Sequence, residues 1–201
     1  MKNYSQANRG QPLEQYIRFA NEGYRRRKIA SIEKLPTEFI PLRDGRGKIY
    51  NVKVEHKSKV DFIGRFRSIP IAIEAKHTYD NNIRFDAVEL HQADYMDEFT
   101  EEPGTIGLVV VSFSLQRFYA IPWAFWKAAY DARVRPGATR TKPVTVEAFG
   151  QTWEVPKKFS VREDELNPLW RFPGNHMHFG LHYLVNATSY ITPSRINRIQ
   201  S

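Results

Sequence analysis

The sequence predicts an α/β fold, with a mixed central sheet flanked by helices and a β-hairpin that protrudes from it. Three observations support this prediction. Residues 11–27 have apolar side chains at helical spacing, residues 38–57 alternate around a Gly-containing turn, and residues 106–113 form an apolar run typical of a strand buried on both faces. The 201 residues suffice for one compact core and are few for two, so we expect a single domain over residues 1–201.

A first amphipathic helix is predicted over Gln11 to Arg27. Its apolar residues recur at intervals typical of one helix face: Leu13, Tyr16, Ile17, Ala20 and Tyr24. Pro12 suits the first helical turn, and the basic run 25–28 suits the last turn, where the helix dipole favours positive charge. A short strand over residues 29–33 follows, which Pro36 interrupts.

Residues 38–57 are predicted to form a hairpin arm, because apolar and polar residues alternate on both sides of the turn sequence Asp44-Gly45-Arg46-Gly47. Residues 43–59, which include most of the arm, carry an excess of positive charge, from Arg43, Arg46, Lys48, Lys53, Lys57 and Lys59 against Asp44 and Glu55. A cationic arm of this kind is suited to neutralising phosphates, which gives sequence-independent, salt-sensitive affinity for DNA. The alternative is a hairpin whose charge only keeps it solvated.

Further strands and helices are predicted along the rest of the chain. Their ranges are strands at 60–63 and 69–76 joined by a turn at 64–67, a helix within 86–99, strands at 106–113 and 117–121, and a short helix at 122–130. Residues 131–201 form a C-terminal extension with strand-like pieces at 144–148 and 152–155. The sequence assigns this extension no role.

The composition favours a polyanionic partner such as DNA. Lys and Arg number 30 against 22 Asp and Glu, which gives a formal net charge of +8 and a pI of about 9.7. The absence of cysteine excludes disulfides, thiolate metal sites and a cysteine nucleophile. The N-terminus has no apolar stretch, and no segment approaches the roughly 18 apolar residues that a membrane span needs. We therefore expect a cytoplasmic protein without a membrane partner.

Chemistry is predicted on the strand Ile69 to Lys76. Strand alternation places Glu74 and Lys76 on the same face, and Asp61 lies on the preceding strand, where antiparallel pairing brings its carboxylate beside that of Glu74. Two carboxylates that close repel each other unless a cation lies between them, and Mg²⁺ is a hard cation that takes oxygen ligands. Lys76 would then orient or deprotonate a water molecule, or stabilise charge on a phosphoryl oxygen. The alternative is an ordinary surface ion pair between Glu74 and Lys76.

Several motifs occur in the order found in one known family. They are Asn8-Arg9-Gly10-Gln11-Pro12-Leu13-Glu14, the segment Ile29 to Thr37 with Pro36, Val60-Asp61-Phe62-Ile63-Gly64, Ile73-Glu74-Ala75-Lys76 and His91-Gln92. This series resembles the RecU-type Holliday junction resolvases of the PD-(D/E)xK nuclease superfamily. The resemblance covers roughly residues 8–130, with a weaker similarity at residues 152–156. Residue 60 is Val, where the superfamily often has Pro and the family a hydroxyl residue.

The resemblance implies a restriction-endonuclease-like core, a homodimer with two active sites, dependence on Mg²⁺ or Mn²⁺, and a stalk that enters the centre of a DNA junction. Residues 38–57 match the stalk in position and basic character. For individual residues, it implies metal ligands at Asp61, Glu74 and the Ala75 carbonyl, and catalytic assistance from Lys76, with support from Gln92 and Glu14. DNA contacts are expected from Arg9, Arg43, Arg46, Lys48, Lys53 and Lys57.

The expected function is therefore a structure-selective, Mg²⁺-dependent endonuclease that resolves four-way DNA junctions by paired nicks. One alternative is another PD-(D/E)xK nuclease, of a restriction or repair type, that cuts linear duplex as readily as a junction. The other alternative is a basic module that binds branched DNA without cutting it, in which the acidic pair is vestigial.

Overall fold

The computed structural model describes residues 11–36, 38–56, 58–138, 143–148, 151–172, 174–175, 180–181 and 183–184. Its centre is a six-stranded sheet in the order β1-β4-β5-β7-β8-β12. These strands are β1 (Ala30–Lys34), β4 (Phe62–Phe66), β5 (Ile69–Thr78), β7 (Ile106–Phe113), β8 (Arg117–Pro122) and β12 (Arg171–Phe172). Strands β5 and β7 are parallel and the other neighbours are antiparallel, so the predicted mixed central sheet is confirmed.

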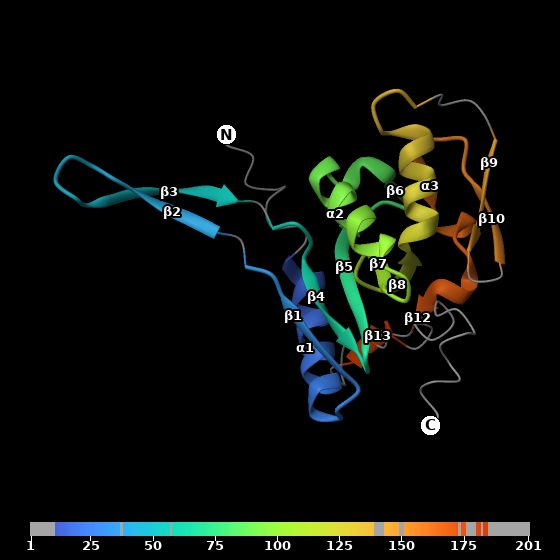
Figure 1. The fold of residues 1–201 in the computed structure, drawn as a ribbon, viewed down its shortest axis with the longest axis horizontal. Coiled ribbons are helices and arrows are strands. Elements are labelled where there is room, and N and C mark those ends of the chain that lie inside the picture. Colours follow the sequence, from blue (N-terminus) through green and yellow to red (C-terminus); the bar gives the residue numbers. More distant parts are fainter. Residues whose placement is uncertain are drawn as a thin grey trace.

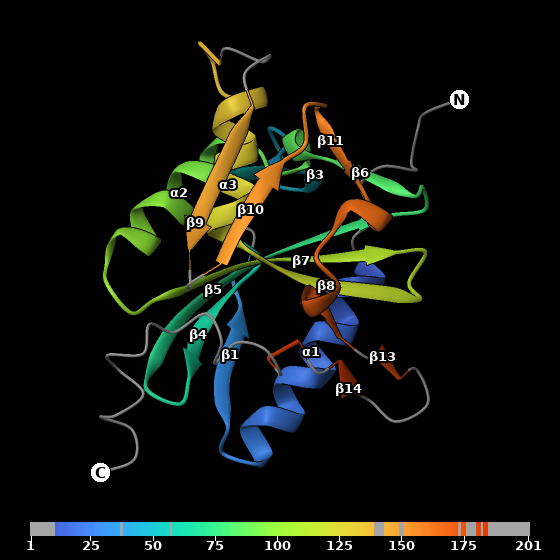
Figure 2. The same ribbon diagram turned by 90° about the vertical axis from the view of Figure 1, so that its right-hand side faces the viewer.

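Helices cover both faces of this sheet. Helix α1 (Gln11–Arg26) packs on one face, while α2 (Leu90–Glu101) and α3 (Trp123–Arg133) pack on the other (Figures 1 and 2). Leu13 and Ile17 of α1 and Trp126 of α3 are fully buried, which shows that each helix turns its apolar stripe to the sheet. Within the described part of the chain, none of the helices is long and apolar enough to cross a membrane.

Short elements surround this core. Strand β6 (Asn82–Arg84) pairs with β11 (Ser160–Arg162), β9 (Val144–Ala148) with β10 (Gln151–Val155), and β13 (Gly174–Asn175) with β14 (Gly180–Leu181). Single turns of 3₁₀ helix occur at η1 (Phe85–Ala87), η2 (Glu163–Glu165) and η3 (Pro168–Trp170). The predicted strands at 144–148 and 152–155 are thus confirmed, the second with one further residue at its start.

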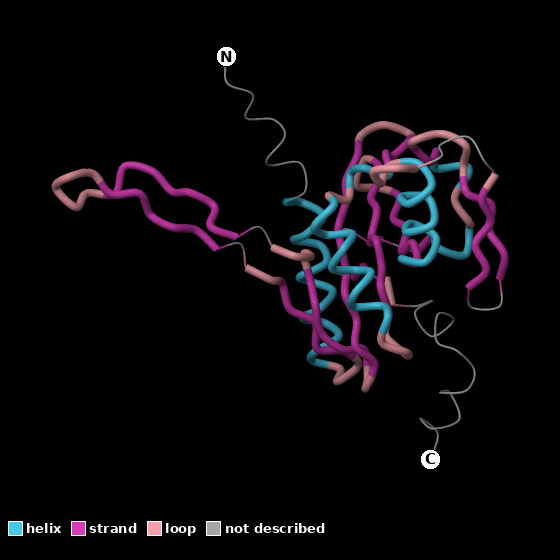
Figure 3. The backbone as a smooth tube through the Cα atoms, turned by 45° about the horizontal axis from the view of Figure 1, so that its top comes forward, coloured by secondary structure: helices cyan, strands magenta, loops and turns pink. Residues whose placement is uncertain are grey.

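The predicted hairpin arm projects away from the sheet (Figures 1 and 3). Its strands are β2 (Glu38–Arg43) and β3 (Ile49–His56), which pair with each other in a separate two-stranded sheet. The turn between them is held by the Asp44 carboxylate, which accepts the backbone N–H groups of Arg46 and Lys48 at 2.9 Å each. Gly47 supplies the positive φ, of 78°, that this turn requires.

The predicted strand at 60–63 and turn at 64–67 are wrong in their boundaries. Strand β4 runs from Phe62 to Phe66, and the turn to β5 comprises only Arg67 and Ser68. Gly64 lies inside the strand, where it pairs with Ile32 of the neighbouring strand β1, and the two backbones are close there: a Cβ at this position would lie 2.1 Å from the Ser31 carbonyl oxygen. The glycine therefore marks a close approach between two strands and not a turn.

The helix predicted within 86–99 begins later, at Leu90, after the turn η1. Its start is fixed by a side chain of its own first turn, since Gln92 Oε1 accepts the Glu89 backbone N–H at 2.9 Å. Smaller boundaries also differ: β1 spans 30–34 where 29–33 was predicted, α1 ends one residue earlier at Arg26, and β5, β8 and α3 continue to Thr78, Pro122 and Arg133.

Part of the C-terminal extension completes the core. Strand β12 is the outermost strand of the central sheet, next to β8. Tyr183 and Leu184 are buried beside α1, where the Tyr183 hydroxyl donates a hydrogen bond to the side-chain oxygen of Asn21. These described parts of the extension therefore have a structural role that the sequence did not reveal.

Candidate active site

The structure brings Asp61 and Glu74 together at the centre of the sheet. Asp61 immediately precedes β4, and the β4–β5 register pairs Phe62 with Ile73, so one further step along each strand places Asp61 opposite Glu74. The Asp61 carboxylate is held there because its Oδ2 accepts the Ala75 backbone N–H at 2.8 Å. Asp61 thus uses its side chain to continue the hydrogen bonding of β5 beyond the end of the strand pair.

Glu74 is the most buried charged group of the site, with a relative exposure of 1%. Burial, opposed by Lys76 and reinforced by the neighbouring Asp61 carboxylate, raises the pKa of Glu74 to about 8. The pKa of Asp61 is also raised, first by burial, while the Ala75 N–H and Lys76 oppose the shift. The two carboxyl groups are close enough to share a hydrogen bond when one is protonated, so the pair holds a proton or requires a cation at neutral pH.

Lys76 and Gln92 surround one oxygen of Glu74. Lys76 Nζ lies 2.5 Å from Glu74 Oε1, and Gln92 Nε2 donates a hydrogen bond to the same oxygen at 2.7 Å. Lys76 also donates to Gln92 Oε1 at 3.2 Å. Because Gln92 belongs to the first turn of α2, this closed set of hydrogen bonds fixes the helix end against β5 and orients both charged side chains.

The other oxygen of Glu74 has no such partners. Glu74 Oε2 is buried and forms no hydrogen bond with any residue that the structure describes. A buried acceptor without a partner costs about 1–3 kcal/mol, which a hard divalent cation at this oxygen would offset. Among the described residues no group of three His, Asp or Glu side chains could hold a metal ion, so a cation here would take its remaining ligands from backbone carbonyl groups, water and substrate.

Glu14 lies near this pair but is engaged elsewhere. Its carboxylate forms an ion pair with Lys34 at the end of β1, and its charge contributes to raising the pKa of Asp61. Lys34 was not singled out in the sequence. A signal was present, however, because Ala30 and Ile32 are buried and strand alternation places residue 34 in the same phase, where a charged residue needs a partner.

The residues expected to bind DNA are only partly within the described structure. Arg46 and Lys48 are exposed in the turn of the hairpin arm, and Arg43 and Lys53 lie in β2 and β3. Arg9 and Lys57 lie outside the described residues.

A mixed sheet in which an acid beside one strand meets a Glu-x-Lys sequence on the next has the arrangement of the PD-(D/E)xK class of proteins. The family model for RecU, Recombination protein U, matches residues 8–162. The chain belongs to this family. The match extends beyond the range of 8–130 expected from the motifs and includes β9, β10 and β11.

Curated relatives named Holliday junction resolvase RecU agree with this membership. The protein of Staphylococcus saprophyticus is 26% identical over 162 residues, which cover 77% of this chain and 76% of the relative. The protein of Streptococcus mutans is 32% identical over 123 residues, which cover 58% of this chain and 62% of the relative. Among solved structures, Archaeoglobus fulgidus Hjc, a Holliday junction resolvase, matches 75% of this chain and 86% of its own at 10% identity and a TM-score of 0.36. That structural likeness adds nothing to the argument for function.

Proposed function

We propose that this chain is a structure-selective, Mg²⁺-dependent endonuclease that resolves four-way (Holliday) DNA junctions by paired nicks. The observation that carries the proposal is the pairing of Asp61 with the buried Glu74, in which Glu74 Oε2 lacks a hydrogen-bond partner among the described residues and Lys76 Nζ lies 2.5 Å from Oε1. Membership of the RecU family and the names of the curated relatives support the choice of substrate.

The residues present fit a hard cation, either Mg²⁺ or Mn²⁺. Asp61, Glu74 and the carbonyl oxygen of Ala75 would hold it, and when bound it would polarise the scissile phosphate and lower the pKa of a coordinated water. Burial of Glu74 and its closeness to Asp61 oppose ionisation of both carboxyl groups. A bound cation would stabilise the doubly ionised pair.

Lys76 would orient the attacking water or take up its proton, and would stabilise the charge that builds on the phosphoryl oxygens. Gln92 holds Lys76 and Glu74 through its amide, with hydrogen bonds of 3.2 Å and 2.7 Å. It thereby fixes the ammonium group relative to the carboxylates. Glu14, paired with Lys34, would contribute negative charge at the edge of the same site and support a bound water.

Selectivity for junctions is assigned to the hairpin arm and to dimer formation. The arm, with Arg46 and Lys48 exposed at its turn, would enter the open centre of a junction, while Arg9, Arg43, Lys53 and Lys57 add positive charge for the phosphates. A two-fold homodimer would present two equivalent sites for symmetric nicks. We further propose that the chain is a single nuclease domain and acts in the cytoplasm, where its DNA substrate lies.

The test compares cleavage of a labelled four-way junction with cleavage of its linear duplex arms, in Mg²⁺ and in EDTA. We expect paired nicks in the junction in Mg²⁺ alone. Asp61→Asn should abolish cleavage while junction binding is retained, and Asp164→Asn, at an exposed residue of η2, serves as the matched control. Equal cleavage of linear duplex would favour a restriction- or repair-type nuclease, and cleavage unaffected by Asp61→Asn would remove the proposed site.

A further inference from the structure

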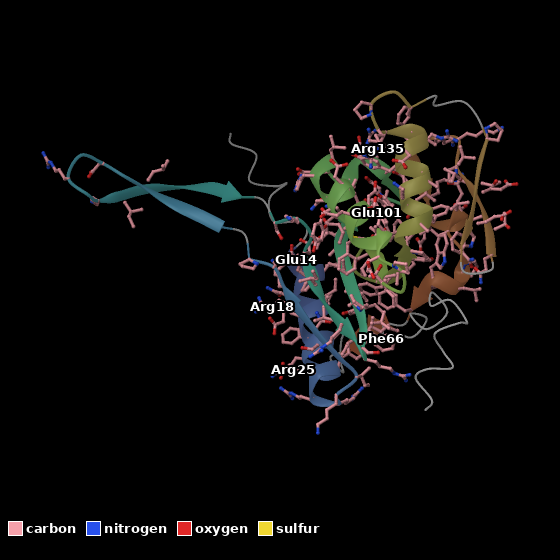
Figure 4. The ribbon with its side chains drawn as sticks, in the orientation of Figure 1. Glu14, Arg18, Arg25, Phe66, Glu101 and Arg135 are labelled. Atoms are coloured by element: carbon pink, nitrogen blue, oxygen red, sulfur yellow. The ribbon has the colours of Figure 1, made fainter. Side chains whose placement is uncertain are left out.

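A cluster of cations occupies the end of α1 and β4 that is farther from the candidate active site (Figure 4). Its members come from the last turn of α1, the residues that follow it, strand β4 and the β4–β5 turn, and all are exposed: Arg25, Arg26, Arg27, Lys28, Arg65 and Arg67. The segments adjoin, because the Arg67 N–H donates to the Ile29 carbonyl at 2.9 Å. Figure 4 shows Glu14 at the end of α1 near the hairpin arm, with Arg25 and Phe66 at the other end. We call these six residues the α1–β4 basic surface.

The positive charge of this surface is mostly not neutralised. Glu22 forms ion pairs with Arg25 and Arg26 at 2.9 and 3.0 Å. No other carboxylate of the described residues lies within ion-pair distance of the six cations. Like charges this close repel one another, and no apolar burial offsets the repulsion because the side chains are exposed, so the arrangement favours an anionic partner.

Backbone conformation points to a role for two of these cations. Lys28 and Arg67 both have positive φ, of 57° and 54°. Lys28 follows the end of α1, where glycine is preferred, and Arg67 stands in a two-residue β-turn, where glycine or asparagine is common. The chain therefore carries a long cationic side chain at two strained positions that a glycine would occupy at lower free energy. Both lie on the α1–β4 basic surface.

The surface lies at a distance from the active site that matches duplex DNA. From Asp61 to Arg67 the chain extends for six strand residues, or about 20 Å at roughly 3.3 Å per residue. From Glu14 to Arg25 it extends for eleven helical residues, or about 16 Å at 1.5 Å per residue. Since duplex DNA rises about 3.4 Å per base pair, a cut at Asp61 would place the duplex roughly five or six base pairs away beside the surface. About half a helical turn separates the two points, so the phosphates that face the surface there belong to the complement of the cut strand.

We propose that the α1–β4 basic surface binds the phosphate backbone of the duplex arm that is being cut, on the complementary strand about five or six base pairs from the scissile phosphate. The proposal rests on the proposed nuclease function. It assigns the hairpin arm to the junction centre and this surface to the flanking duplex. Contact at two separated points along one arm fixes the direction in which the arm leaves the junction, and phosphate contacts do so without reading sequence.

The test uses the double variant Lys28→Gly and Arg67→Gly, which removes two cations and relieves positive φ at both positions. Binding to a junction with long arms is measured in EDTA, so that no cleavage occurs, between 50 and 200 mM salt. Loss of two phosphate contacts should flatten the plot of log affinity against log salt by about 1.8, so that the variant loses roughly tenfold less affinity than the wild type over this range. Thermal unfolding should occur at or above the wild-type Tm.

Two matched controls separate charge from backbone effects. Ser114→Gly relieves a positive φ of 54° without removing a charge, and Lys158→Gln removes an exposed cation from outside the surface. Neither should change the salt dependence by as much as the double variant does.

Position is tested with neutral methylphosphonates placed on the complementary strand, five and six base pairs from the mapped cut. They should weaken binding of the wild type and leave binding of the double variant nearly unchanged. Equal affinity and equal salt dependence of variant and wild type would overturn the surface proposal alone, as would equal sensitivity to the methylphosphonates. A wild type that neither binds nor cuts the junction would overturn the nuclease proposal as well.

Discussion

Replacement of Glu74 by Gln should make the metal-free protein more stable at alkaline pH. Folding raises the pKa of Glu74 from its ordinary value of 4.5 to about 8, so the folded state retains a proton that the unfolded chain releases between these values. The contribution of Glu74 to stability is therefore present below pH 4.5 and is lost as the pH rises through 8. A pKa shift of this size lowers the free energy of unfolding by on the order of 5 kcal/mol between the two pH values.

The assay is urea unfolding in EDTA at pH values from 5 to 9. The wild type should lose several kcal/mol relative to Glu74→Gln over this range, while the two differ much less at pH 5. Mn²⁺ or Mg²⁺ should restore stability to the wild type at pH 8 and not to the variant, since binding to the folded state alone is stabilising. Glu101→Gln, at an exposed residue of α2, is the matched control. Parallel pH dependence of wild type and Glu74→Gln would refute the reasoning.

Three further predictions concern the β1–β4 contact, the active site and the hairpin arm. Gly64→Ala should destabilise the fold by about 3 kcal/mol or more in urea unfolding, because its Cβ would lie 2.1 Å from the backbone of β1. Gly45→Ala is the control: open space surrounds this residue, so stability should change by less than about 0.5 kcal/mol. Similar values for both variants would contradict the contact between the strands. Gln92→Leu should lower kcat about 10- to 100-fold with little change in KM, and unchanged kcat would show that its amide orients nothing. Arg46→Gln with Lys48→Gln should weaken junction binding and flatten its salt dependence by up to about 1.8, while identical affinity in filter binding would exclude the arm from DNA contact.

Patterns within single segments predicted much of the fold. Strands β7 and β9 begin and end where their apolar or alternating runs do, because the burial of a strand determines the hydrophobic pattern of its consecutive residues. The juxtaposition of Asp61 and Glu74 was also predictable, since alternation fixes the face of Glu74 and a short antiparallel connection limits where Asp61 lies.

Features that depend on distant partners were not predictable in this way. Gly64 has the local signature of a turn, and its place in a strand depends on pairing with β1, which is distant in sequence and approaches too closely for a side chain. Likewise, nothing near Asn21 indicates that this buried amide of α1 binds the hydroxyl of Tyr183. The ion pair of Glu14 and Lys34 joins a helix to a strand end, and the alternation of β1 places Lys34 on the inward side of the strand without identifying its partner.

The point at which the hairpin arm leaves the sheet has an evolutionary consequence. Strands β1 and β4 are antiparallel neighbours, with Lys34 paired to Phe62 and the Leu35 N–H bonded to the Asp61 carbonyl at 2.8 Å. The arm is thus an insertion into a connection that a short loop would close. Lineages can lengthen, shorten or exchange such an insertion without disturbing the strands beneath it, so shape recognition and bond cleavage are free to diversify separately on one scaffold.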